Sequence, residues 1–149
     1  MIDGVQNINL IARVDDRGYL IEIVRATDPF LTKFGQVYLV GNFAHGTVRA
    51  FHKHAQLWDL FFVNHGAAKF VLVDDRRDSP TYKEMNTFNV SDRNPTLIVV
   101  PPGIFHGWMS LQHDTQMIST ATDVYNRERP DEVRVPPDSF GEVWTVKGR

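Results

Sequence analysis

Three histidines and one aspartate are the residues whose types and spacing are best suited to chemistry in this chain. His52 and His54 are one residue apart, so on a β-strand both imidazoles would point to one face and converge on a shared ligand or metal ion. Asp59 follows shortly afterwards, and His106 comes after the turn-forming residues 101–103. Three imidazoles with a carboxylate suit Zn, Fe, Mn or Ni, whereas the same groups without a metal could transfer protons or form hydrogen bonds.

Short β-strands are the elements expected to position these side chains. From Gly18 onward the apolar residues fall in short bursts between turn formers, and no long segment has a helical period. This pattern predicts an all-β jelly-roll barrel or sandwich, with residues 1–149 as a single domain. The one helix expected is short, at residues 27–34, where Pro29 would lie in the first turn. The predicted strands are residues 19–24, 36–40, 47–51, 57–63, 68–73, 84–89, 96–100 and 116–120.

Charge and composition exclude several classes of function. The 16 basic and 18 acidic side chains give a net charge of -2, and the basic residues are dispersed, which argues against a general nucleic-acid binder. The chain has no cysteine, which removes disulfides and thiolate chemistry and fits a reducing compartment, so a cytoplasmic location is expected. Neither a signal peptide nor an apolar run of membrane-spanning length is visible, and we expect no membrane association.

The two histidine blocks resemble the two cupin motifs, with Asp59 where cupins usually carry Glu and Ser110 where the second motif usually has Asn. Across nearly the whole chain, further motifs resemble the dTDP-4-dehydrorhamnose 3,5-epimerase family of this superfamily. A cupin jelly-roll barrel acting on a nucleotide sugar is therefore expected. The motifs that carry the resemblance are Asp16-Arg17-Gly18-Tyr19 with Glu22, Phe34-Gly35-Gln36, Arg49 to His52, residues 73–76 with 78–81, Pro102 to Gly107, and Tyr125.

The resemblance also implies roles for individual residues. His52 matches the segment with the catalytic base, Asp138 is the expected carboxylate that orients it, and His54 is a second proton carrier or polar anchor. Removing a proton beside a ketone requires such a base and a group that stabilises the enolate, and no cofactor. A residue like Arg17 comes from a swapped strand in that family, which implies a homodimer. The expected substrate-binding residues are Arg17, Tyr19, Glu22, Gln36, Arg49, His106, Ser119 and Tyr125.

Two departures from the epimerase pattern leave alternatives open. Asp59 occupies the place of a lysine that steadies the enolate, and Ser119 the place of a tyrosine that returns the proton on the opposite face. A divalent metal on His52, His54, Asp59 and His106 could replace the lysine as electrophile. The reaction could instead move protons on one face only, as in the sugar 3,4-ketoisomerases, whose Arg-x-x-His-x-His segment is similar to residues 49–54. A non-catalytic nucleotide-sugar-binding module is the third possibility.

Overall fold

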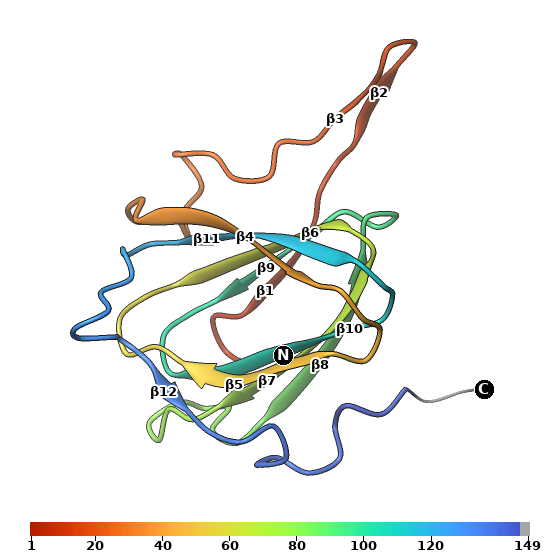
Figure 1. Cartoon of the computed structure of the whole chain (residues 1–149). Helices are drawn as coiled ribbons and strands as arrows, with labels where there is room; N and C mark the ends of the chain where they lie inside the picture. The colour runs from red at the N-terminus through yellow and green to blue at the C-terminus, as the bar shows by residue number, and fades with distance from the viewer. Residues whose placement is uncertain (147–149) are drawn as a thin grey trace.

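Two antiparallel five-stranded sheets face each other in the computed structural model, which describes residues 1–146 (Figure 1). In spatial order the first sheet consists of β1 (Gln6–Asn9), β9 (Thr96–Val100), β6 (Asp59–His65), β11 (Thr115–Ala121) and β4 (Gln36–Asn42). The second consists of β12 (Val133–Arg134), β5 (Val48–Lys53), β10 (Ile104–Ser110), β7 (Ala67–Asp74) and β8 (Met85–Ser91). A separate hairpin, β2 (Arg13–Asp15) and β3 (Gly18–Leu20), projects away from the sheets. Residues 1–146 contain no helix long and apolar enough to cross a bilayer.

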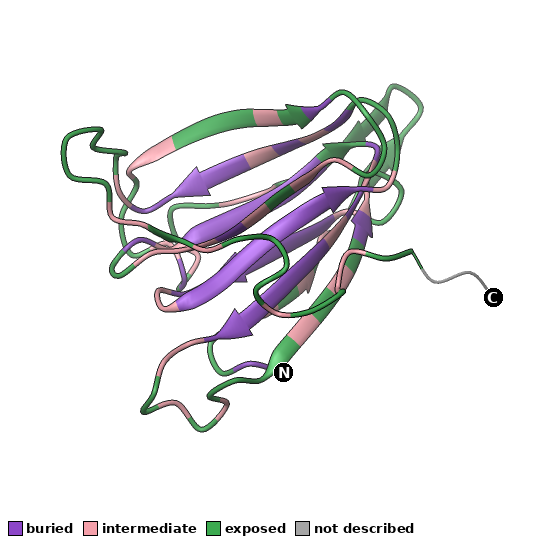
Figure 2. Ribbon diagram, turned by 60° about the horizontal axis from the view of Figure 1, so that its bottom comes forward, coloured by how far each residue is buried: buried purple, intermediate pink, exposed green. Residues whose placement is uncertain are grey.

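The predicted all-β jelly roll is confirmed, and seven of the eight predicted strands lie in the two sheets with ends displaced by at most two residues. The strand predicted at residues 19–24 is shorter and belongs to the projecting hairpin. Buried residues are concentrated in the central strands of the two sheets, whereas most of the loops and much of the edge strand β4 are exposed (Figure 2). The extent of the domain, residues 1–149, stays a prediction.

The short helix predicted at residues 27–34 is wrong, because the chain there forms turns. The carboxylate of Asp28 accepts a hydrogen bond from the backbone N–H of Arg25 at 2.7 Å, so it closes the turn before it instead of capping a helix after it. Phe30 and Leu31 pack with Leu60 on the outer face of the first sheet. This burial of apolar surface outweighs the local helix signal.

Strand β10 is missing from the predicted set because its sequence has neither of the two strand patterns. All seven of its residues are buried, so no polar positions alternate with the apolar ones, and His106 and Gly107 interrupt the apolar run that makes the equally buried β9 recognisable. His106 and Trp108 line the space between the sheets. Phe105 packs on the outer side, where the ring of Phe140 lies 5.5 Å away between centroids. The part of the tail from Val135 to Trp144 therefore covers the outer face of the second sheet.

A β-bulge in β5 decides which side chains reach the interior. His52 pairs with His106 of β10, but the next cross-strand pair is Arg49 with Trp108, so β5 has one residue more than β10 between the two pairs. In a regular strand Arg49 and His52 would point to opposite faces, because they are three positions apart. The bulge, which lies opposite Gly107, brings both side chains to the interior.

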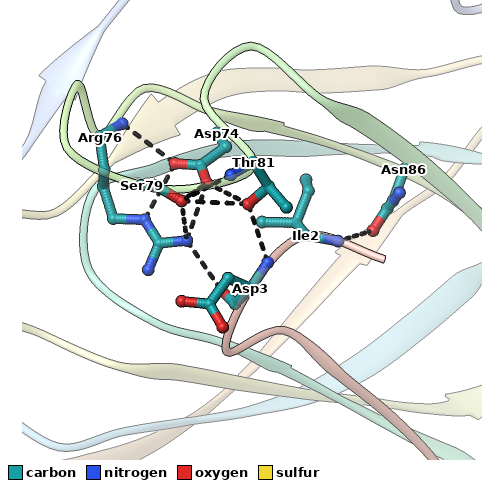
Figure 3. A network of polar contacts seen from close by, with 7 residues as sticks. All are labelled: Ile2, Asp3, Asp74, Arg76, Ser79, Thr81 and Asn86. Carbon is teal, nitrogen blue, oxygen red and sulfur yellow. Dashed lines mark hydrogen bonds and ion pairs between the residues drawn. The ribbon is translucent and has the colours of Figure 1, made fainter.

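A buried aspartate organises the loop that joins β7 to β8 (Figure 3). The Asp74 carboxylate accepts hydrogen bonds from the Arg76 guanidinium at 2.8 and 2.9 Å and from the hydroxyls of Ser79 and Thr81 at 2.6 and 2.7 Å. Arg76 also donates to the carbonyl oxygen of Asp3 at 2.7 Å, which ties the N-terminal segment to this loop. Burial opposes ionisation, but these hydrogen bonds outweigh it and hold the pKa of Asp74 well below its usual range.

Replacing Asp74 with asparagine should lower the free energy of unfolding by about 3 kcal/mol at pH 7. The asparagine amide has one acceptor oxygen and no charge, whereas Arg76, Ser79 and Thr81 donate to two charged carboxylate oxygens. The folded-state pKa lies below the unfolded value of 3.8, so the stabilisation is complete above about pH 5 and is lost as the pH falls further. Urea unfolding at pH 7 and pH 3 measures both effects. The control is Asp78→Asn in the same loop, which is exposed and should change stability by less than about 0.5 kcal/mol. Equal losses for both variants would contradict the role of Asp74.

Candidate active site

A cavity of about 700 Å³ opens between the two sheets. The first sheet lines it with side chains of β4, β6 and β11, which include Gln36, Tyr38 and Asp59. The second sheet contributes side chains of β5, β7 and β10, which include His52 and His106. Polar groups that converge in a partly apolar cavity are typical of a small-molecule site.

The three predicted histidines meet in this cavity. Nε2 of His52 lies 3.0 Å from Nε2 of His106, and the two ring centroids are 4.2 Å apart. The ring of His54 lies 5.3 Å from that of His52 and 5.9 Å from that of His106. Asp59 is buried beside them, and one ligand atom from each of the four residues lies within 4.8 Å of all the others. The expected convergence of these residues is confirmed.

Backbone carbonyl groups fix the proton positions on two of the rings. Nδ1 of His106 lies 3.0 Å from the carbonyl oxygen of Ile104, and Nδ1 of His54 contacts the carbonyl oxygen of Asp131. A carbonyl oxygen only accepts hydrogen bonds, so each Nδ1 carries a proton and each neutral ring has its lone pair on Nε2. These Nε2 atoms are 3.3 Å (His54) and 3.2 Å (His106) from Oδ2 of Asp59.

The Asp59 carboxylate oxygen therefore faces two lone pairs. It is buried and has no hydrogen-bond donor among the described residues. Three acceptors so close together repel one another, because nothing positive lies between them. Either a proton on one of the rings or a bound cation would relieve the repulsion, and the site is built to hold a positive charge at this point.

His52 is held in its neutral form. Burial lowers its pKa to about 2, together with the neighbouring His106, His54 and Arg134, since each of these disfavours a second positive charge. At neutral pH the ring therefore has a lone pair available to accept a proton. An anionic substrate beside it would raise this pKa, because a negative charge stabilises the imidazolium.

Three of the other predicted residues also line the cavity, namely Gln36, Arg49 and Tyr125. Arg49 donates from Nε to the side chain of Asn42 at 2.7 Å. Ser119 is fully buried on β11, and its hydroxyl makes no hydrogen bond of good geometry within residues 1–146. Because Met117 and Ala121 of the same strand line the cavity, the alternation of a β-strand turns Ser119 inward as well.

Arg17, Tyr19 and Glu22 are not brought to the cavity of their own chain. Arg17 is at the tip of the projecting hairpin (Figure 1), with 85% of its side chain exposed and its guanidinium paired with Asp15. Tyr19 is 76% exposed, and Glu22 is exposed as well.

Asp138 does not contact His52 in the structure, and this corrects the prediction that its carboxylate orients the His52 ring. Asp138 is exposed in a turn, where its carbonyl oxygen accepts a hydrogen bond from Gly141 N–H at 3.0 Å. Nearby, Phe140 packs against Phe51 with a centroid distance of 4.9 Å, on the outer face of the second sheet. His52 points to the inner face, so the sheet separates it from this part of the tail. The carboxylate beside the histidines is that of Asp59.

Sequence reasoning missed the part of the tail that completes the site. Val133 and Arg134 pair with β5 as strand β12, and Glu132 and Arg134 line the cavity. The Asp131 carboxylate accepts hydrogen bonds from three consecutive backbone N–H groups, residues 55–57, which lower its pKa although burial opposes this. A two-residue strand gives no periodic signal, so these positions could not be found from the pattern alone.

Tyr38 was also missed, although it lines the cavity from β4. Tyr38 is 42% exposed as a whole residue, but partial burial of its phenol and the charge of Asp59 raise the pKa of this group, while the neighbouring hydroxyl of Ser119 partly offsets them. The phenol is therefore protonated at neutral pH. In the sequence Tyr38 reads as an ordinary strand residue, and only the pairing of β4 with β11 places it beside Ser119.

The jelly roll and its histidine-lined cavity define this protein as a cupin, as the sequence motifs indicated. The sequence model of the dTDP-4-dehydrorhamnose 3,5-epimerase family matches residues 1–147, and the chain belongs to this family of nucleotide-sugar isomerases. It is 37% identical to the spore coat polysaccharide biosynthesis protein SpsL of Bacillus subtilis (strain 168) over 152 residues, with 100% of both chains covered.

Two further comparisons agree with this assignment. The probable low-salt glycan biosynthesis epimerase Agl13 of Haloferax volcanii is 32% identical over 145 residues, which cover 92% of this chain and 89% of that protein. The crystal structure of the dTDP-4-dehydrorhamnose 3,5-epimerase of Bacillus anthracis str. Ames, with TDP and PPi bound, superimposes with a TM-score of 0.85 at 24% identity. The superposition covers 97% of this chain and 87% of that chain and confirms the fold.

Proposed function

We propose that this protein isomerises a nucleotide-linked keto-sugar of the dTDP-4-keto-6-deoxyhexose type, with His52 as the base that removes the proton next to the ketone. The observation that carries the proposal is the neutral ring of His52, which contacts His106 inside a cavity that also contains two arginines. A neutral imidazole accepts a proton, and arginines hold a diphosphate through bidentate contacts. The bound TDP of the Bacillus anthracis relative supports a nucleotide ligand.

The remaining side chains have complementary roles in this proposal. Arg49 and Arg134 bind the anionic end of the substrate, and Gln36 and Tyr125 contact the rest of it. The proton that His52 removes from the substrate can be shared with Nε2 of His106, which lies 3.0 Å away and next to the Asp59 carboxylate. A proton held there would stabilise the developing enolate, in place of the family lysine that this chain lacks.

Deuterium exchange tests the proposal directly. A dTDP-4-keto-6-deoxyhexose incubated with the protein in D₂O should gain deuterium at a carbon beside the keto group, observed by mass spectrometry and NMR. We expect exchange at least about 100-fold above the protein-free rate, the contribution typical of a positioned general base. Absence of exchange across several nucleotide sugars would rule out the proposed reaction. Thermal stabilisation by dTDP without any exchange would instead indicate a binding module.

A homodimer completes the site in this proposal. The hairpin places Arg17 far from its own cavity, and it exposes Val14, Tyr19 and Leu20, which are 75%, 76% and 58% exposed. Edge strand β4 offers an apolar outer surface, where Leu39 is 62% exposed. Apolar surface on a projecting hairpin and on a sheet edge is typical of an interface. The hairpin of one copy would carry Arg17 to the cavity of the other. We also propose that the protein is located in the cytoplasm.

Light scattering should therefore give twice the chain mass of 17.1 kDa, and a variant without residues 12–20 should be monomeric. The truncated protein should bind dTDP at least about 10-fold more weakly, because it loses the arginine of the partner copy. A monomeric full-length chain that binds dTDP with undiminished affinity would contradict the dimer.

A metal-dependent cupin is the second candidate function, and the unpartnered Oδ2 of Asp59 specifically favours it. His52, His54, Asp59 and His106 fit a divalent ion in number, type and spacing. Backbone carbonyls hold Nδ1 of His54 and His106, as is usual for histidines that bind a metal through Nε2. A bound ion would supply a Lewis acid to polarise a carbonyl group.

Elemental analysis of protein purified without a histidine tag separates the two candidates. If the site is metal-dependent, we expect about one divalent ion per chain, with at least a 10-fold lower content in His54→Ala and Asp59→Asn. His45→Ala and His113→Ala are the controls, since both residues are exposed and neither belongs to the cluster. Full activity of chelator-treated protein with no detectable metal would exclude this candidate.

A further inference from the structure

The two walls of the cavity differ in the proton-carrying groups that they offer. His52 and His106 belong to the second sheet, whereas Tyr38 and Ser119 belong to the first. Within the described part of the chain, Tyr38 is the only titratable hydroxyl that the first sheet presents to the cavity. A sugar ring bound between the sheets would therefore have His52 on one side and the phenol of Tyr38 on the other.

The strand register shows why Tyr38 can reach the cavity. Ser119 of β11 is directly opposite Tyr38 of β4 and directly opposite Phe61 of β6, so the three form one row across the first sheet. The ring of Phe61 lies 5.4 Å from that of His106, which places this row against the histidine cluster. Ser119 is the smallest member of the row, and its hydroxyl lies next to the phenol of Tyr38.

Inversion at a carbon beside a ketone needs two groups on opposite faces. A base first removes the proton, and the electron pair of the broken C–H bond forms the enolate. A second group must then donate a proton to the same carbon from the other side. A single imidazole cannot reach both faces of a bound ring. The serine hydroxyl at position 119 is a far weaker acid than a phenol, and Ser119 is fully buried within the row.

We propose that Tyr38 is the catalytic acid that protonates the substrate carbon on the face opposite His52, from the strand next to the one that carries Ser119. This inference rests on the proposed isomerase function and adds an inverting reaction to it. The Tyr38 O–H bond breaks as the new C–H bond forms, which leaves a phenolate on β4 and an imidazolium at His52. Transfer of one proton from His52 to Tyr38 through water in the open cavity restores the resting state. Since its phenol is protonated at neutral pH, Tyr38 starts in the required form.

The test separates proton removal from proton return. In Tyr38→Phe, which keeps the ring and lacks the hydroxyl, the rate of deuterium entry into recovered, uninverted substrate should stay within about threefold of wild type. Formation of the inverted product should fall at least about 100-fold, the effect expected for loss of a general acid. Tyr82→Phe, in the loop after β7 and away from the cavity, is the control and should leave both rates unchanged.

The outcomes are distinct. Unchanged product formation in Tyr38→Phe overturns the inference and leaves the proposed isomerase intact, as would be expected of a ketoisomerase acting on one face. Loss of exchange and product together, in a folded variant, also overturns it, because Tyr38 would then serve binding or structure. No exchange in the wild-type protein removes the proposed function itself.

The double variant Tyr38→Ser/Ser119→Tyr moves the phenol to the neighbouring strand. Product formation should be at least about 10-fold faster in this double variant than in Tyr38→Ser. A folded double variant without this recovery contradicts the inference.

Discussion

His52→Asn should abolish turnover of the keto-sugar, with kcat reduced at least about 1,000-fold, because the side chain loses the lone pair that accepts the substrate proton. The amide of asparagine occupies part of the imidazole volume and can still face His106, so the cavity should keep its shape. Both deuterium exchange and product formation should disappear, in contrast to Tyr38→Phe, where exchange should persist. Single-turnover measurements with excess enzyme isolate this chemical step from substrate binding.

Two measurements establish that the loss is chemical. The variant should melt within a few degrees of wild type, and its thermal stabilisation by dTDP should be unchanged, since His52 does not bind the diphosphate in the proposed arrangement. His45→Asn is the matched control, because His45 is an exposed histidine in the turn before β5. A His52→Asn protein that exchanges deuterium at more than about a tenth of the wild-type rate would show that another group is the base.

Gly107→Ala should cost about 3 kcal/mol of stability and lower the melting temperature by about 10 °C, although it adds only one methyl group. A Cβ at this position would lie 2.3 Å from Cβ of Ala50, 2.8 Å from its Cα and 2.9 Å from the carbonyl oxygen of Arg49. Two of these atoms belong to the backbone, so β5 would have to move away from β10. Because these strands carry His52 and His106, activity should fall together with stability.

A paired variant separates this steric cause from a general sensitivity of β10. Adding Ala50→Gly removes the atom at 2.3 Å but leaves the two backbone contacts, so the double variant should recover part of the lost stability, about 1 kcal/mol. Ala50→Gly alone should destabilise the protein modestly, as glycine does in a strand. Chemical denaturation gives all four values. Additive losses in the double variant would show that the Gly107 position is not limited by Ala50.

Much of the candidate site could be predicted from the sequence because it depends on local spacing. His52 and His54 fall on alternate positions next to a strand end, and His106 follows a tight turn, so their convergence in a barrel follows from the motifs. Strands were predictable where the residues alternate in exposure over a long enough run, as in β8, or form an unbroken apolar run, as in β9. The four-residue β1 is too short for its alternation to be recognised, and His106 and Gly107 interrupt the apolar run of β10.

Tertiary structure alone decided the rest, because long-range pairing leaves no local pattern. The bulge in β5 turns Arg49 to the same face as His52, contrary to simple alternation, and only the register with β10 shows it. Pairing of β4 with β11 places Tyr38 beside Ser119, and pairing of β12 with β5 brings in Arg134. The resemblance led to Asp138 as the partner of His52, but a sheet lies between them. The sequence by itself determined which residues can carry protons and that they lie on strands. The packing of the sheets determined which of these residues share one cavity. A strand has two faces, and only its neighbouring strands fix which face points inward.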